Sequence, residues 1–95
     1  MDTNRNASNQ LSIDFDKIES KLYRKITKSI VKEFELEEEN KLTNGLDEIF
    51  QNFRLNNMIV GLEWDIWSGY TVVAQNIQAE PLVSKIGNYI NENYL

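Results

Sequence analysis

The apolar positions in the first third of the chain recur at helical spacing. They are Phe15, Ile18, Leu22, Ile26 and Ile30. Residues three or four positions apart share one face of a helix, so this spacing predicts a long helix near residues 14–33. Ser12 or Asp14 could serve as its N-cap. Six basic residues fall on the opposite face of this helix: Lys17, Lys21, Arg24, Lys25, Lys28 and Lys32.

The segment EFELEEENK, residues 33–41, supports two interpretations. Phe34 and Leu36 alternate with glutamates, as in a short edge strand. The consecutive carboxylates Glu37, Glu38 and Glu39 suit a solvated loop instead. Because carboxylates are unfavourable at a helix C-terminus, the preceding helix is expected to end before them.

A second, shorter helix is predicted over residues 44–54. Its apolar positions are Leu42, Leu46, Ile49, Phe50 and Phe53. Thr43 or Asn44 could cap it, with Asp47 and Glu48 in the first turn. The pair Asn56-Asn57 then interrupts the pattern.

The last part of the chain predicts a hairpin and a helix. Residues 58–64 alternate between apolar and other positions, and residues 70–75 form the expected partner strand. Ser68-Gly69 is a turn signal between them. Pro81 suits the first turn of a helix that continues to the C-terminus. An isolated hairpin is marginal in water, so it must either gain a third strand, from residues 34–37 or 11–13, or lie between helices.

These elements predict a small α+β protein. The expected arrangement has a long N-terminal helix, a second short helix, a central antiparallel hairpin with a possible third strand, and a C-terminal helix. Residues 1–12 are expected to form a flexible N-terminal tail, since the first ten are polar and rich in asparagine. Residues 13–95 would form one domain.

Composition removes most enzymatic chemistry. The 95 residues include no cysteine and no histidine, which excludes zinc sites of the Cys or His type and nucleophiles activated by histidine. We therefore expect a protein that is not an enzyme and needs no metal or cofactor. The first residues, MDTNRNASNQLSIDF, show no apolar segment of a signal peptide. No apolar run approaches the roughly 20 residues that cross a bilayer, so we expect a cytoplasmic protein.

The net charge of −5 is unevenly distributed along the chain. Residues 15–34 carry six basic and three acidic side chains, whereas residues 35–95 carry three basic and ten acidic ones. A broad acidic surface disfavours nucleic acids and anionic membranes and favours basic partners. For the basic helix, a solvated face is favoured over contact with nucleic acid, because the helix lacks interleaved aromatic residues.

The stretch EWDIWSGY, residues 63–70, is the main candidate for a functional site. By alternation Trp64 belongs with the core. Trp67 lies in the connecting loop, where it either folds back as a lid over the sheet, the favoured interpretation, or stands out as an anchor for a partner. Glu63 and Asp65 point to the same side of a strand. Paired carboxylates can catalyse glycoside hydrolysis, but a chain of this size has little room for the cleft that this chemistry requires.

The same hairpin resembles small bacterial immunity proteins, which protect cells from toxins of contact-dependent growth inhibition or related secretion systems. The residues that carry the resemblance are Glu63 to Tyr70, Thr71 to Ala74 and the segment from Pro81 to Leu95. It implies a protein that binds a basic, nuclease-type toxin and blocks its active site or substrate path.

Under this hypothesis, carboxylates attract the toxin and aromatic residues anchor it. The carboxylates are Glu37, Glu38, Glu39, Glu63 and Asp65, and the anchors are Trp67 and Tyr70. The alternative is a generic protein-interaction module, or a homodimeric structural subunit that pairs through the edge of the hairpin.

Overall fold

Three neighbouring strands form the centre of the structure: β5 (Glu48–Leu55), β6 (Met58–Asp65) and β7 (Gly69–Ala74). In the computed structural model, which describes residues 2–95, eight residue pairs join β5 to β6 and six join β6 to β7. The first hairpin turns at the two-residue loop Asn56-Asn57, where Asn56 has a φ of 56°. Asparagine tolerates this left-handed conformation better than most residues, which makes it a preferred residue of tight hairpin turns.

Shorter strands extend the sheet on both sides. β2 (Leu11–Phe15) pairs with β7, and β1 (Asp2–Arg5) pairs with β2. On the other side, β3 (Glu37–Glu38) and β4 (Thr43–Asn44) both pair with β5. The result is a seven-stranded antiparallel sheet with the order β1-β2-β7-β6-β5-β3, in which β4 also lies beside β5.

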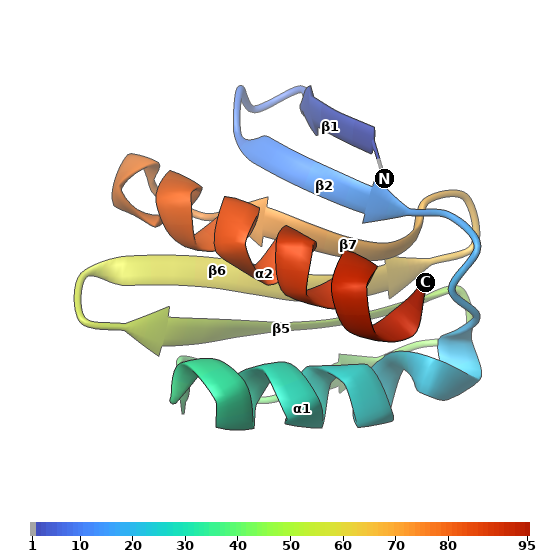
Figure 1. Ribbon diagram of the computed structural model, residues 1–95. Coiled ribbons are helices and arrows are strands. Elements are labelled where there is room, and N and C mark those ends of the chain that lie inside the picture. Colours follow the sequence, from blue (N-terminus) through green and yellow to red (C-terminus); the bar gives the residue numbers. More distant parts are fainter. Residues whose placement is uncertain (1) are drawn as a thin grey trace.

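Two helices pack against one face of the sheet (Figure 1). A short 3₁₀ turn, η1 (Ser20–Leu22), leads into α1 (Tyr23–Phe34), and η2 (Ile77–Ala79) leads into α2 (Glu80–Tyr94). α2 contacts β2, β6 and β7, whereas α1 contacts β6. Neither helix of residues 2–95 has the length and apolar character needed to cross a membrane.

The core lies between this face and the helices. It consists mainly of aliphatic side chains with two buried tyrosines, Tyr23 and Tyr70. The Tyr23 hydroxyl donates to the carbonyl oxygen of Leu62 at 2.5 Å, and the Tyr70 and Thr27 hydroxyls are 2.6 Å apart. Every buried side-chain nitrogen and oxygen among residues 2–95 has a hydrogen-bond partner. In the part of the chain that the structure describes, no helix lies against the opposite face of the sheet (Figure 1).

The expected arrangement of a long N-terminal helix, a second short helix and one hairpin is wrong. Residues 14 and 15 belong to β2, and the first helical turn starts only at Ser20. Ser12 and Asp14 lie in β2 and cap no helix. Phe15 and Ile18 do reach the core, but they do so from a strand and a loop, so their helical spacing is coincidental. Residues 2–5, in the segment expected to be a flexible tail, form β1.

The helix predicted over residues 44–54 is also wrong. Residues 48–55 form β5, in which Ile49, Gln51 and Phe53 face the helices and Phe50 faces the other way. Asn56-Asn57 is therefore the turn of a hairpin and not the end of a helix. In contrast, the strands predicted over 58–64 and 70–75 are confirmed, as are the helix that includes Pro81 and the end of α1 at Phe34, before the glutamates.

Candidate functional site

The face of the sheet opposite the helices, here called the sheet face, is the main candidate surface. Strand alternation places on it the odd-numbered residues of β6 and β7 and the even-numbered residues of β1, β2 and β5. Its centre is Gly61, where a Cβ atom would lie 2.7 Å from Nε2 of Gln75 and 2.8 Å from Oε2 of Glu63. Side chains of the neighbouring positions therefore lean over this glycine.

The sheet face carries the net negative charge of the protein. Its charged residues, by strand register or by contact with a residue on it, are Asp2, Asp14, Glu37, Glu39, Glu48, Glu63, Asp65 and Arg54. Seven carboxylates and one guanidinium give this face a charge of −6. The remaining nine basic and eight acidic side chains leave +1 for the rest of the chain. The molecule is therefore acidic on one side and close to neutral elsewhere.

The carboxylates differ in how they are compensated. Glu39 accepts two hydrogen bonds from the Arg54 guanidinium, at 2.6 and 2.8 Å, and these bonds lower the pKa of Glu39. Within residues 2–95, no cation forms such a pair with Glu63. Burial and then the neighbouring charges of Asp65 and Glu48 raise the pKa of Glu63 above its ordinary value. The middle of the sheet face thus has a site where a cation from outside would be stabilising.

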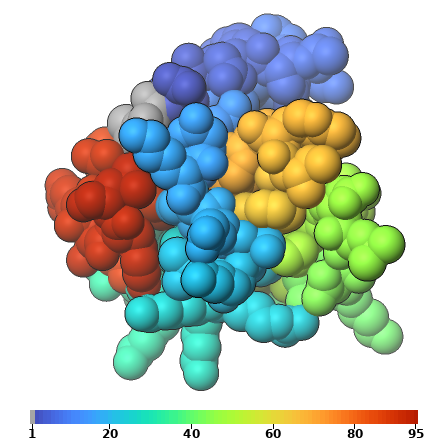
Figure 2. All heavy atoms as spheres, turned by 90° about the vertical axis from the view of Figure 1, so that its right-hand side faces the viewer, coloured from blue at the N-terminus to red at the C-terminus, as the bar shows by residue number. Residues whose placement is uncertain are grey.

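Exposed apolar side chains gather at one end of this face. Trp67 is 80% exposed and Ile66 is 51% exposed in the turn between β6 and β7. Leu46, in the turn between β4 and β5, is fully exposed. The two turns are neighbours, because Glu48 pairs with Asp65. They lie side by side in Figure 2, in green and in yellow to orange. Leu46, Ile66 and Trp67 are here called the apolar end.

Asp65 shapes this end of the molecule. Its Oδ1 accepts hydrogen bonds from the backbone N–H groups of Trp67 (2.9 Å) and Ser68 (2.7 Å). Such bonds hold a turn in place locally. Gly69 completes the turn with a φ of 67°. Trp67 is thus held outward by a defined loop and not by packing.

The structure separates the residues that the sequence proposed as one site. Glu63, Asp65 and Trp67 do lie near one another. Glu37 and Glu39 lie on the sheet face, but beside Arg54, which is at the other end of β5 from Glu48. Glu38 pairs with Phe53 and so belongs to the side of the helices.

Tyr70 is a correction to the predicted site, because its side chain is 0% exposed and cannot anchor a partner. Trp64 is its register partner and also faces the helices. The Trp64 ring packs against the core, as alternation predicts, and its Nε1 donates to the carbonyl oxygen of Ile18 at 2.9 Å.

Sequence reasoning missed several residues of this surface: Asp14, Leu46, Glu48, Phe50 and Ile66. Asp14, Glu48 and Phe50 were assigned to helices, which hid their alternation. Apolar and polar side chains alternate on both sides of the Asn56-Asn57 turn, and this pattern would have placed Glu48 and Phe50 on a strand.

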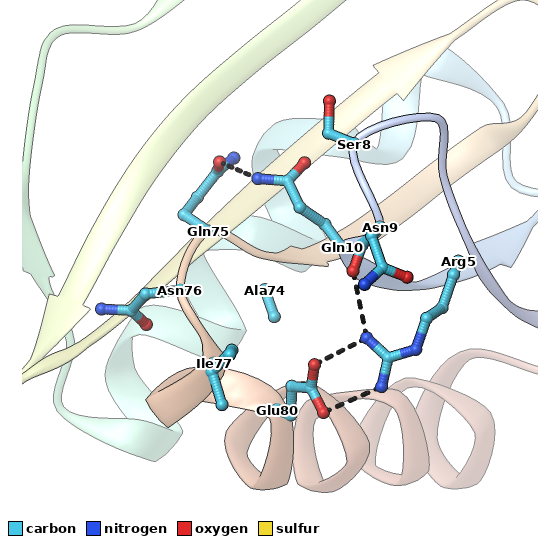
Figure 3. A pocket seen from close by; sticks show the side chains of 9 residues that line it. All are labelled: Arg5, Ser8, Asn9, Gln10, Ala74, Gln75, Asn76, Ile77 and Glu80. Carbon is cyan, nitrogen blue, oxygen red and sulfur yellow. Dashed lines mark hydrogen bonds and ion pairs between the residues drawn. The ribbon is translucent and has the colours of Figure 1, made fainter.

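A cavity of about 620 Å³, whose lining Figure 3 shows, lies at the opposite end of the sheet. Its two charged side chains neutralise each other, since Arg5 donates to both carboxylate oxygens of Glu80, at 2.7 and 3.1 Å. Gln10 donates to Gln75 at its rim. This ion pair lowers the pKa of Glu80, so the cavity presents no carboxyl group poised for proton transfer near neutral pH.

Among residues 2–95, no three potential ligands of the types His, Cys, Asp or Glu come together as they would around a metal ion. Comparisons with protein-family models, with curated proteins and with solved structures found no match to this chain.

Proposed function

We propose that this protein is a non-enzymatic inhibitor that binds a basic partner protein through its sheet face and its apolar end. The observation that supports this most directly is the charge of −6 on a face that no helix covers. The apolar end adjoins this face at Asp65 and Trp67. Acidic charge beside exposed aromatic and aliphatic side chains is the chemistry expected for recognition of a basic protein.

The two parts of the surface have different roles in the proposal. The carboxylates accelerate association by attracting a positively charged partner, and this effect weakens as salt is added. Trp67 and its apolar neighbours then slow dissociation by burying their exposed surface. Truncating a tryptophan at the centre of an interface typically costs about 2 kcal/mol or more.

The specific form that we propose is immunity to a bacterial toxin, with the complex formed in the cytoplasm. A nuclease-type toxin needs a basic site to hold the phosphates of its substrate. The sheet face would cover such a site and exclude the substrate without any chemistry of its own. This form rests on the resemblance of residues 63–74 and 81–95 to immunity proteins, together with the charge of the sheet face.

The first test uses the purified product of the gene next to that of this chain. Its affinity is measured by isothermal titration calorimetry for the wild type, for Trp67→Ala and for Glu37→Lys combined with Glu48→Lys. We expect Trp67→Ala to weaken binding about thirtyfold or more. Association rates are measured by stopped-flow fluorescence at two salt concentrations, and the double variant should reduce both the rate and its dependence on salt.

The matched control is Glu33→Lys combined with Glu92→Lys, which changes the net charge equally but on the exposed surfaces of α1 and α2. If both double variants weaken binding equally, net charge and not the sheet face attracts the partner. If the neighbouring protein neither binds nor slows growth when expressed alone, the immunity assignment is wrong. A wild-type protein that dimerises and binds nothing would favour the structural subunit instead.

A further inference from the structure

A second surface, on the side of the helices, has a different chemistry. A groove runs between α1 and the strands β3, β4 and β5. It has two lobes of about 250 and 420 Å³, and Arg24 lines both of them. The floor of this α1 groove is mainly apolar and includes Val31, Leu42, Ile49, Phe53 and Trp64.

Three cations follow the helical rim of the α1 groove. Lys21, Arg24 and Lys28 are three and four positions apart along η1 and α1, so they form one row. The only carboxylate that lines either lobe is Glu38. Within residues 2–95, neither Arg24 nor Lys28 forms an ion pair, and the pair between Lys21 and Glu19 is largely exposed to solvent. The groove therefore combines an apolar floor with an excess of positive charge.

We propose that the α1 groove binds an extended acidic peptide segment of another protein, with acidic and apolar side chains in alternation. Alternate side chains of an extended peptide point in opposite directions, so one set can reach the floor while the other faces the cations. From Lys21 to Val31 the helix rises about 15 Å, which matches about five extended residues.

Nucleic acid fits this surface less well. Proteins that bind single strands stack the bases on exposed aromatic rings. Of the aromatic side chains that line the α1 groove, Tyr23 and Phe53 are buried, and the half-buried Trp64 packs against the core. The apolar floor instead favours a ligand that brings aliphatic side chains.

The probe is a fluorescein-labelled six-residue peptide in which glutamate and leucine alternate, with both ends neutralised. Binding is followed by fluorescence anisotropy for the wild type and for Arg24→Gln combined with Lys28→Gln. We expect this double variant to bind about tenfold more weakly, which is the loss expected for two largely exposed ion pairs. A peptide in which serine replaces leucine should bind at least tenfold more weakly than the original.

The matched control is Lys25→Gln combined with Lys32→Gln, which removes the same charge from exposed positions of α1 that do not line the groove. This control should change binding less than twofold. Equal losses in the two double variants would overturn the proposal, because attraction would then come from charge alone. Tighter binding of a twelve-nucleotide single-stranded DNA than of the peptide would also overturn it.

This inference is tested separately from the inhibitor proposal, although Leu46 of the apolar end also lines the smaller lobe of the α1 groove. The variant Glu37→Lys with Glu48→Lys alters only the sheet face, so it should retain the peptide. Failure of one surface therefore does not imply failure of the other.

Discussion

Replacing Tyr70 by phenylalanine tests whether this residue is part of the core and not an anchor for a partner. The side chain is fully buried, and its hydroxyl lies 2.6 Å from that of Thr27, which is 8% exposed. Burial raises the pKa of Tyr70 well above its ordinary value, so the phenol remains neutral at any pH at which the protein would be studied. The bond thus joins two neutral groups that have little access to water.

The expected loss in the free energy of unfolding depends on which hydroxyl each substitution leaves without a hydrogen-bond partner. Tyr70→Phe removes the bond and leaves a nearly buried hydroxyl on Thr27, at a cost of about 1–2 kcal/mol. For a domain of this size, the melting temperature falls by about 4–8 °C for each kcal/mol. Thr27→Val should cost a similar amount, because it leaves the Tyr70 hydroxyl unpaired. The double variant replaces both hydroxyls by apolar groups, so its cost should be about 1 kcal/mol less than the sum of the two.

The assay is urea denaturation followed by circular dichroism at 25 °C, with the slope of the transition checked for constancy. The control is Tyr89→Phe, whose hydroxyl bonds to Ser29 in a half-buried position that water can reach. Its effect should stay below about 0.5 kcal/mol. Strict additivity of Tyr70→Phe and Thr27→Val would refute the reasoning, since the two hydroxyls would then stabilise the fold independently.

Two further substitutions test the sheet and its turn. Gly69→Ala should prevent folding or cost more than about 3 kcal/mol, because its Cβ would lie 2.2 Å from the carbonyl oxygen of Phe15 and the φ is positive; thermal denaturation of the purified variant checks this. Glu63→Gln should stabilise the protein at pH 7. Burial and the charges of Asp65 and Glu48 raise the pKa of Glu63 above its ordinary value of 4.5. The free energy of unfolding therefore falls as the pH rises from 4.5 through the raised pKa, because the folded protein holds this proton more tightly than the unfolded chain does. Urea titrations at pH 7 and pH 3.5 check the sign, since the gain should vanish at the lower pH.

The parts of the fold that sequence could predict are those with a local signal. Core positions alternate with positions on the sheet face along β6 and β7, and the turn at Ser68-Gly69 joins the two strands. Pro81 lies in the first turn of α2 and so indicates where this helix begins. In β2 the local signal is misleading. Only Leu11, Ile13 and Phe15 alternate there, which is too short a run to outweigh a helical spacing that continues for fifteen residues. The pairing of β2 with β7, a long-range interaction, decides its conformation.

β5 shows a different failure, because its sequence satisfies both periods. Ile49, Phe50 and Phe53 fit a helix, yet Ile49, Phe53 and Leu55 fit a strand. Eight residue pairs with β6 outweigh the local preference. Once β5 is a strand, Asn56-Asn57 becomes recognisable as a hairpin turn of the kind that asparagine favours.

The candidate site was partly predictable for the same reason. The alternation in β6 predicts that Glu63 and Asp65 share the outward face of the strand. Trp67 lies in the turn after β6, where the sequence allows an accessible side chain. Tyr70 was misassigned although the hairpin register alone pairs it with Trp64, which alternation had already placed in the core. Asp14 and Glu48 add to the charge of the sheet face only because β2 lies beside β7 and β5 lies beside β6. This order of strands comes from the topology and not from a local pattern.

The separation of charge between the two sides of the molecule decides how partners can approach. Charges in water are screened over about 8 Å at physiological salt, whereas the molecule measures 30 × 27 × 25 Å. A protein at the sheet face therefore senses the seven carboxylates there and very little of the cations on α1. The net charge of −5 is thus a poor guide to either surface. A basic partner is attracted to the sheet face and repelled by α1, so electrostatics alone orients its approach. For the same reason electrostatics allows an acidic segment to occupy the α1 groove while the sheet face holds a basic partner, with Leu46 as a residue that both surfaces share.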